Sequence, residues 1–249
     1  MHKCIRIQLS GQSALYKKPM SIGVWESYPL PPYSTVIGFV HKACGFTNYH
    51  PMQVSIQGRA MSKISDLYIR YFTGGTTYED GRHQIAVPTD EFTDSGEPKL
   101  LGVFRAATNT ELLIDINLLI HIKPDNEADF DVVLNGLKRP QIYPSLGRHE
   151  DLVSIKHVSV VEYYETKTVA LDKEMDAYVP ASLLESSKKA LTGANYILNK
   201  TYDVNQKTKF REWKKEKTVF LRAGKRIAVS QSGIYACKVN GQEEGIFFA

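Results

Sequence analysis

The stretch from Tyr28 to Gly45 limits the possible folds more than any other part of the chain. It reads Y-P-L-P-P-Y-S-T-V-I-G-F-V-H-K-A-C-G. Its three prolines hold the backbone extended, because each one fixes φ and removes a hydrogen-bond donor. Ser34 or Thr35 then predicts a capped helix start, and Gly45 predicts a left-handed stop. The stretch therefore predicts a stiff approach followed by an amphipathic helix of about three turns.

The residues inside this helix indicate both packing and a possible site. Val36, Ile37, Val40 and Cys44 fall on one face. Gly38 weakens a helix by about 1 kcal/mol relative to alanine, so we expect a close backbone approach there. A helix N-terminus with two hydroxyl groups also suits an anion. An ordinary packing helix explains the same residues, and the pattern alone leaves both interpretations open.

Length and composition favour a cytoplasmic globular protein. The 249 residues are enough for one large domain or two small ones with a sizeable core. No apolar run approaches the length of a membrane span, and Lys3 and Arg6 interrupt any early signal-like segment. Cys4, Cys44 and Cys237 lie far apart without metal-ligand spacing, which favours buried thiols in a reducing compartment.

Positive charge is concentrated in two segments, although the formal net charge is only +4. Residues 1–63 carry a net charge of +6 and residues 199–226 a net charge of +7, which leaves −9 for the remainder. Two separate basic segments on an otherwise acidic protein favour a surface that binds a polyanion such as nucleic acid. The alternative is that each segment is only a solvated face.

The predicted elements follow the order strand–helix–strand and then strand–helix–strand. The second helix is indicated by the stripe Phe130, Val133, Leu134 and Leu137, with Asp125 or Asn126 as its cap. Alternating apolar residues predict strands at residues 3–9, 54–61, 67–72, 110–121 and 153–164. This order is that of the ferredoxin-like α+β fold, in which two helices cover one face of an antiparallel sheet. The other face is open and often binds RNA.

Two further regions depart from this core order. The segment between the strands at Tyr71 and Leu100 is long for a compact connection and rich in glycine and charge. It predicts a projecting hairpin or finger, hinged at Gly74 and Gly75. Past about residue 165, short strands separated by glycine-containing turns predict a small β-rich subdomain, in which Asn240-Gly241 marks a two-residue hairpin.

Catalytic patterns are scarce in the sequence. There is no glycine-rich phosphate loop with its Lys-Ser/Thr, no Gly-x-Ser-x-Gly elbow, and no histidine pair at metal-ligand spacing. His41 with Lys42, and His121 with Lys123, each offer a general acid and a cation for metal-free RNA cleavage. Each set is also explained as an ordinary polar pair on a helix or a sheet.

Two motifs resemble a known family. Y-P-L-P-P-Y-S-T-V-I-G follows the first strand, and R-P-Q-I-Y-P-S-L-G-R, centred on Gly147 and Arg148, precedes the strand at residues 153–164. Together they resemble CRISPR-associated protein 5, a family of the RAMP superfamily whose members are subunits of type I Cascade surveillance complexes in antiviral defence. Ser34, Thr35 and Gly38 stand where the family pattern has them. The motifs cover roughly the first 160 residues, and the later part resembles the family only in its short strands.

The resemblance implies a domain plan and a function. The plan is a ferredoxin-like (RRM-like) RAMP domain at residues 1–165, a β-hairpin thumb inserted at about residues 73–99, and a β-rich C-terminal subdomain at residues 166–249. The implied function is a non-catalytic subunit without metal or cofactor that binds and caps the 5′ handle of CRISPR RNA. Its implied partners are the Cascade backbone subunit and large subunit, with target DNA met only through the complex. The RNA-binding residues that we infer on this basis are Ser34, Lys42, Arg70, Tyr78, Arg82, His83, Arg105 and Arg148.

One branch of the family differs because its members cut the precursor RNA with a Tyr, a Lys and an adjacent His. Here His121-Ile122-Lys123 places the two residues apart and in reversed order, which favours a separate processing endonuclease. A metal-independent endoribonuclease is therefore the alternative function. A protein-only interaction module is a third hypothesis. Under this hypothesis, both basic segments serve only to keep the protein soluble.

Overall fold

The structure is a computed structural model that describes residues 2–21, 23–185, 187, 192–230 and 233–249. The described elements, in chain order, are β1 (His2–Ala14), α1 (Tyr33–Cys44), β2 (Met52–Thr77), β3 (Ile85–Phe92), β4 (Pro98–Pro124), α2 (Asp129–Lys138), β5 (Val153–Thr166), β6 (Thr168–Ala170), β7 (Asp176–Pro180), α3 (Ala181–Leu184), β8 (Ala194–Val204), β9 (Arg211–Leu221), β10 (Arg226–Ala228), β11 (Ile234–Val239) and β12 (Gln242–Ile246). The protein is mostly β, with few helices. None of the described helices combines the length and the hydrophobicity needed to span a membrane.

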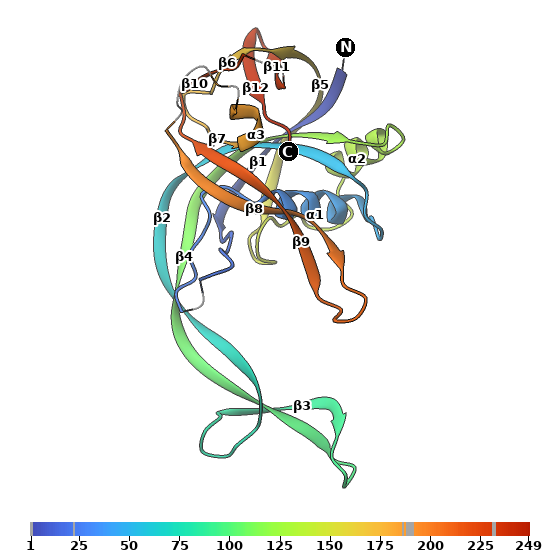
Figure 1. Ribbon diagram of the computed structural model, residues 1–249, viewed down its shortest axis with the longest axis vertical. Coiled ribbons are helices and arrows are strands. Elements are labelled where there is room, and N and C mark those ends of the chain that lie inside the picture. The colour runs from blue at the N-terminus through green and yellow to red at the C-terminus, as the bar shows by residue number, and fades with distance from the viewer. Residues whose placement is uncertain (1, 22, 186, 188–191, 231–232) are drawn as a thin grey trace.

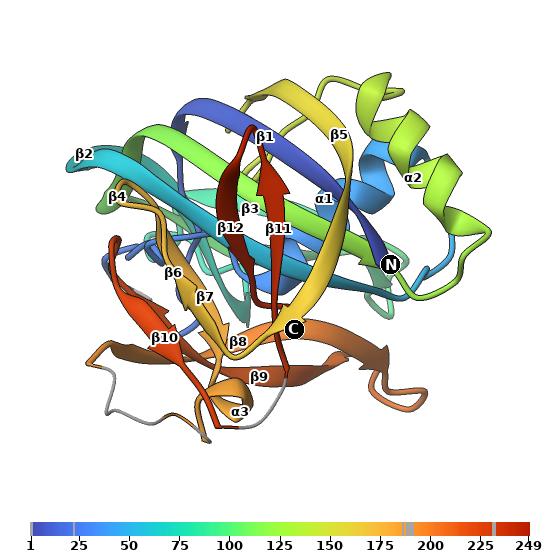
Figure 2. The same ribbon diagram turned by 90° about the horizontal axis from the view of Figure 1, so that it is seen from above.

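One large antiparallel sheet contains most of the strands. Its order is β12-β11-β5-β1-β4-β2-β7-β9-β8, β3 pairs with β4, and β6 and β10 form a separate pair. The sheet is strongly curled, and α1 and α2 lie side by side against it (Figures 1 and 2). Fully buried Ile5, Val36, Val40, Ile120 and Leu137 from β1, α1, β4 and α2 belong to one hydrophobic cluster. Burial of this cluster is the main force that fixes the two helices on the sheet.

The start of α1 differs from the prediction, whereas its end agrees with it. The helix begins at Tyr33 with Pro32 at the N-cap, and no side chain caps it, so capping by Ser34 or Thr35 is wrong. The fixed φ of Pro32, −58°, already suits a helix start, and its carbonyl accepts from Thr35 N at 3.0 Å. At the other end Gly45 adopts φ 70° and stops the helix in the left-handed conformation, as predicted.

The predicted faces of both helices are confirmed. Val36, Ile37, Val40 and Cys44 of α1 are buried, whereas Gly38 is exposed and a Cβ there would meet no described atom within 4 Å. The close approach expected at Gly38 is therefore not made by the described part of the chain.

The second helix also starts without a side-chain cap. It begins at Asp129 with Ala128 at the N-cap, so capping by Asp125 or Asn126 is wrong. Asn126 Oδ1 instead accepts from Ala128 N at 3.1 Å within the preceding turn. The apolar stripe is as predicted: Val133 and Leu137 are buried, and Phe130 and Leu134 pack against the same cluster.

β2 and β4 form one long hairpin whose outer half projects from the body as an arm, residues 64–112 (Figure 1). Pairing runs from Met52 opposite Pro124 to Thr77 opposite Leu101. The predicted break between the strands at residues 54–61 and 67–72, near Lys63 and Ser65, does not exist. The prediction was wrong because both faces of the arm are largely exposed, so the strand there does not need alternating hydrophobicity.

The glycines predicted as a hinge lie inside β2. The register of β2 against β4 shifts between Thr73 and Thr77, and Gly75 adopts φ 69° within this shift. Gly74 and Gly75 therefore form an irregularity near the end of the arm, not a hinge at its base. The projecting part extends well beyond the predicted insertion on both sides.

Strands after residue 165 extend both edges of the same sheet. β7, β9 and β8 continue it beyond β2, and the β11–β12 hairpin continues it beyond β5. Asn240 and Gly241 join β11 to β12 with φ 50° and 80°, which confirms the predicted tight turn. A second hydrophobic cluster is built only from residues 169–247, but Tyr178, Leu198 and Phe220 belong to the main cluster. The division into two domains stays a prediction.

The cysteines pack as the sequence predicts. All three are buried free thiols. Burial raises the pKa of Cys4 to about 12 and the pKa values of Cys44 and Cys237 to about 11. At neutral pH they are protonated, and they behave as small apolar side chains.

Candidate nucleic-acid interface

Three cations and two aromatic rings meet at the base of the arm. We call this group, Lys17, Trp25, Tyr68, Arg70 and Arg148, the basic-aromatic cluster. Lys17 Nζ lies 3.9 Å and Arg70 Cζ 3.8 Å from the centre of the Trp25 ring. Arg70 Cζ and Arg148 Cζ lie 4.9 and 5.6 Å from the centre of the Tyr68 ring. Attraction to the shared ring faces keeps positive charges together that would otherwise repel.

The loop between β1 and α1 brings Lys17 and Trp25 to this place. Trp25 N donates to Asn109 O at 2.9 Å, and Glu111 N donates to Trp25 O at 2.8 Å, so the loop is clipped to β4. Tyr68 and Arg70 lie two residues apart on β2 and therefore share one face of the arm.

Arg148 is held by a buried carboxylate. Asp151, fully buried, accepts from Leu15 N at 3.0 Å, from Arg148 N at 2.8 Å and from Arg148 Nη2 at 2.6 Å. Burial opposes the charge of Arg148, but the hydrogen bonds with Asp151 outweigh it and raise its pKa. Gly147 has φ 122°, and a Cβ there would lie 2.7 Å from Asp151 Oδ2, so only glycine fits this turn.

Lys17 and Arg70 carry the charge that is not neutralised. Neither takes part in any ion pair found among the described residues. Nε of Arg70 is buried and has no hydrogen-bond partner in the described part of the chain. Partial burial and then the neighbouring Arg70 charge lower the pKa of Lys17. Two cations held together without a counter-ion favour an anion as their partner.

The first turn of α1 opens onto the same place. A cavity of about 250 Å³ is lined by Lys17, Trp25, Pro32, Thr35 and Arg148, among others. Backbone N–H groups at a helix N-terminus attract anions through their partial positive charge. The site therefore combines cations, half-buried aromatic rings and a helix N-terminus, which suits the phosphates of a nucleic acid.

The predicted site residues on the body fall in different places. Arg70 and Arg148 are brought together in the cluster. Ser34 lies in the first turn of α1 and lines the neighbouring cleft between α1 and the hairpin of β8 and β9, not the cavity at the cluster. Lys42 is exposed in the last turn of α1, at the opposite end from the cluster.

The other predicted residues on the arm are outside the cluster, and Arg105 lies beside it, because it pairs with Tyr71, the residue after Arg70. Tyr78, Arg82 and His83 follow the end of β2, at the far end of the arm, and Arg105 is exposed on β4. His83 is buried: its Nδ1 accepts from Glu79 N at 3.0 Å, and its ring lies 4.7 Å from that of Phe104. His83 therefore has a structural role in holding the end of the arm.

The sequence reasoning did not identify Lys17, Trp25 and Tyr68 as site residues. Lys17 lies within the basic segment at residues 1–63, but no sequence pattern singles it out. No local pattern connects it to Arg70, because only the long-range pairing of the strands places the two side chains over one ring.

Both histidines considered for catalysis are engaged within the fold, although His41 is half-buried and lines a cleft beside α1. His121 is fully buried, with Nε2 3.7 Å from Glu244 Oε2, and burial lowers its pKa. His41 Nδ1 lies 2.8 Å from Ile37 O, and its Nε2 accepts from His50 N at 2.9 Å. Both ring nitrogens of His41 are thus used within the fold, and the burial of its ring lowers its pKa.

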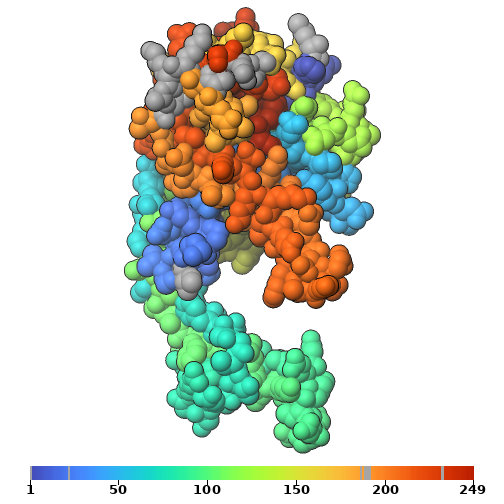
Figure 3. Space-filling model, viewed as in Figure 1, coloured from blue at the N-terminus to red at the C-terminus, as the bar shows by residue number. Residues whose placement is uncertain are grey.

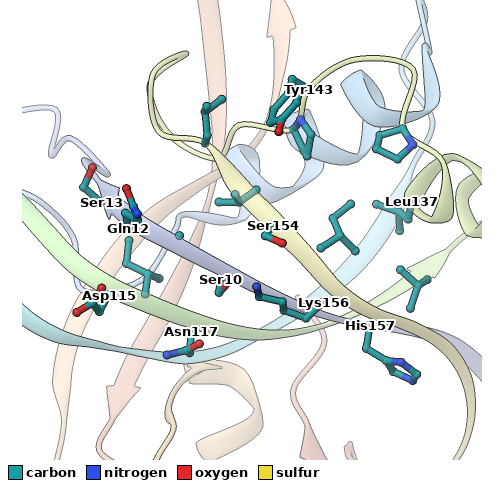
Figure 4. Close-up of a pocket in the computed structure, with 18 of the residues that line it drawn as sticks. Ser10, Gln12, Ser13, Asp115, Asn117, Leu137, Tyr143, Ser154, Lys156 and His157 are labelled. Carbon is teal, nitrogen blue, oxygen red and sulfur yellow. The ribbon is translucent and has the colours of Figure 1, made fainter.

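A wide hollow of about 1120 Å³ lies elsewhere, between β1, β4, β5 and the loop after α2 (Figure 4). Ser10, Asp115, Asn117 and Lys156 are among the side chains that line it. Asp115 and Lys156 bring opposite charges to its walls, so it lacks the single-sign charge of the basic-aromatic cluster.

Comparison with known proteins agrees with the motifs. A family model described as CRISPR-associated protein (Cas_Cas5) matches residues 4–218. A search of curated proteins gave no match. Among solved structures, a chain from a "CRISPR RNA-guided surveillance complex" is 17% identical with a TM-score of 0.51, and the match covers 89% of this chain and 91% of that one. A CRISPR protein from Archaeoglobus fulgidus is 12% identical with a TM-score of 0.46, over 99% of both chains.

These comparisons carry different weight. The surveillance-complex chain shows a shared fold and, at this identity, no more than that. The family match is stronger because it spans most of the chain, including both sequence motifs and the residues of the basic-aromatic cluster. The resemblance read from the sequence is therefore confirmed, and the chain belongs to the CRISPR-associated protein 5 family.

Proposed function

We propose that this chain is the subunit of a CRISPR RNA-guided surveillance complex that binds and caps the 5′ handle of the CRISPR RNA. The observation that supports this most is the basic-aromatic cluster beside the N-terminus of α1. Lys17 and Arg70 suit phosphates because they lack a carboxylate partner in the described structure, and the Trp25 and Tyr68 rings hold these cations in place. A chain of similar fold comes from such a complex.

The domain plan is part of the same proposal. β1, α1, β2, β4, α2 and β5, with strand order β5-β1-β4-β2, support a ferredoxin-like domain at residues 1–165. The arm, which contains residues 73–99, is its thumb. Residues 166–249 are the β-rich C-terminal part that extends both edges of the sheet.

The arm supports contact with a neighbouring subunit. Leu67, Ile69 and Tyr71 alternate along β2 and are 68%, 63% and 63% exposed. They share the face opposite Tyr68 and Arg70, and an exposed apolar row of this kind favours a protein partner. We assign this row to the backbone subunit of the complex, the body to the large subunit, and target DNA to indirect contact only.

The proposed subunit holds RNA in the cytoplasm without cutting it. The burial of His121 and the use of both His41 nitrogens within the fold disfavour the alternative, a metal-independent endoribonuclease. The protein-only module is disfavoured by the unpaired cations of the basic-aromatic cluster.

The test is binding of single-stranded handle RNA to the full chain over a range of salt concentrations. Arg70→Ala should weaken binding about tenfold and reduce the log–log salt slope by about 0.7, the contribution of one phosphate contact. Arg226→Ala, which removes an exposed cation on β10, is the matched control and should change neither quantity. Equal effects of the two substitutions, or no RNA binding by the unmodified chain, would refute the proposal.

A further inference from the structure

A second concave surface lies between α1 and the hairpin of β8 and β9. We call it the α1 cleft; it has a volume of about 470 Å³, and its lining includes Thr35, Gly38, Tyr49, Tyr202, Arg211 and Trp213. The hairpin crosses α1, and its tip projects from the body on the same side as the arm (Figures 1 and 3). The volume of the α1 cleft is in the range of small-ligand sites.

Gly38 keeps the floor of this cleft open. It lies in the middle of α1 and is exposed, although glycine disfavours a helix relative to alanine. Its φ is not positive, and a Cβ there would meet no described atom within 4 Å. Neither backbone conformation nor packing within the described chain therefore requires glycine. What the missing side chain provides is room above the helix.

The walls of the cleft are aromatic and basic. Tyr49 and Tyr202 are 56% and 42% exposed, and the half-buried Trp213 ring lies 5.1 Å from that of Tyr202, edge to face. Arg211 Cζ lies 4.5 Å from the centre of the Tyr202 ring, and Lys200 adds a second cation. None of the lining residues is acidic.

This chemistry points to single-stranded nucleic acid, not to a protein. Apolar protein side chains do not need two cations in the wall, whereas a nucleotide presents a ring to stack and a phosphate to neutralise. Thr35 also lines the cavity at the basic-aromatic cluster. The two sites therefore meet at the first turn of α1, and one strand can pass from one to the other.

We infer that the α1 cleft binds one nucleotide of the single-stranded RNA that the basic-aromatic cluster holds. The base lies over Gly38 against Trp213 and Tyr49, and its phosphate faces Arg211 and Lys200. This inference rests on the proposed function, because it extends the same RNA site to a second set of residues. It also assigns a role to Lys200 and Arg211, two cations of the basic segment at residues 199–226.

The first experiment fills the cleft without damaging the fold. Gly38→Leu places a side chain where the base would lie, and Gly38→Ala is the control with the same gain in helix propensity. Single-stranded RNA of about eight nucleotides is titrated into each full-length variant and followed by fluorescence anisotropy. Gly38→Leu should weaken binding at least about tenfold and Gly38→Ala less than about twofold, and neither should lower the melting temperature.

A second variant tests stacking directly. Trp213→Ala should weaken binding by about 5- to 150-fold, and Trp213→Phe should restore most of the affinity because it keeps a ring. In a Trp25→Phe background, the fluorescence of Trp213 should be quenched when RNA binds.

The outcomes separate this inference from the proposed function. If Gly38→Leu binds RNA like Gly38→Ala while Arg70→Ala binds weakly, the inference is wrong and the proposed function stands. If Gly38→Leu binds RNA normally but loses a protein partner from the reconstituted complex, the cleft is a protein-docking site and the inference is again wrong. If the unmodified chain binds no single-stranded RNA, both are wrong.

Discussion

Removing the outer part of the arm should leave the rest of the fold intact. β2 and β4 pair directly at Phe72 and Phe104, so residues 73–103 can be replaced by Asn-Gly, which closes a two-residue hairpin between these partners. The cut leaves Tyr68 and Arg70 in place, so the basic-aromatic cluster is retained.

The structure gives the size of the effect. No residue in the range 64–112 belongs to any of the three hydrophobic clusters formed by the described residues. His83 and Val103, the buried side chains of the removed segment, are remote from those clusters; the contacts of His83 are with Glu79, Thr76 and Phe104, all in the arm. We therefore expect the free energy of unfolding to change by less than about 1 kcal/mol and the melting temperature by less than about 4 °C.

The assay pairs calorimetry of the isolated chain with reconstitution of the complex on guide RNA. The truncated chain should melt normally and bind short RNA normally, but it should assemble poorly because the thumb is missing. A smaller cut, in which Asn-Gly replaces residues 93–97 between the paired Phe92 and Pro98, is the control and should assemble. A melting temperature lowered by more than about 10 °C would show that the arm is part of the folding core. Normal assembly of the truncated chain would contradict the assignment of the arm as the thumb.

Two other predictions concern buried charge and catalysis. Glu244→Gln should lower the melting temperature by about 4–10 °C, because it breaks the partly buried ion pair with Arg6. In this pair Arg6 Nη2 lies 2.7 Å from Glu244 Oε1. The control is Glu243→Gln at the adjacent exposed position, which should shift the melting temperature by less than about 2 °C. Burial raises the pKa of Glu244, but the adjacent His121 ring and the hydrogen bonds from Arg6 outweigh burial and lower it to about 2. The stability from this pair should therefore be full above pH 4.5, the ordinary pKa, and lost as the pH falls toward 2; a Glu244→Gln chain with the same acid-induced loss would contradict this. Finally, the purified chain should not cleave repeat RNA with or without divalent metal, and site-specific cleavage abolished by His41→Ala or His121→Ala would overturn the non-catalytic assignment.

Local signals in the sequence were enough to predict local structure. Gly45 and Asn240-Gly241 were identified correctly because their positive φ values are required by a helix end and a tight turn. The continuous course of β2 was missed because the arm has no buried face along most of its length, and hydrophobic alternation appears only where one face is buried. The predicted caps of α1 and α2 were wrong because the presence of a residue that can cap a helix does not mean that its side chain forms the capping hydrogen bond.

The candidate site was only partly predictable for a related reason. Family resemblance and charge were enough to predict Arg70 and Arg148 as site residues. Lys17 and Trp25 reach them through a loop that is clipped to β4 by backbone hydrogen bonds. Backbone hydrogen bonds of this kind leave no side-chain signature, so no motif search finds them. The histidines illustrate the reverse case, since His121 and His83 have side chains that suit catalysis or RNA binding, but both are buried.

Alternation along one strand gives the arm two different surfaces. Tyr68 and Arg70 belong to the basic-aromatic cluster, whereas Leu67, Ile69 and Tyr71 are exposed on the opposite face. The base of the arm is held by the basic-aromatic cluster and by the clip of Trp25 to β4, but the arm has no share in the hydrophobic clusters formed by the described residues, so little fixes the direction of its outer part. On the proposed function, RNA on one face and a neighbouring subunit on the other would both restrict the same long hairpin. The partner that binds first restricts the motion of the arm, so the second partner loses less conformational entropy when it binds. The two binding events should therefore favour each other without any direct contact between the partners.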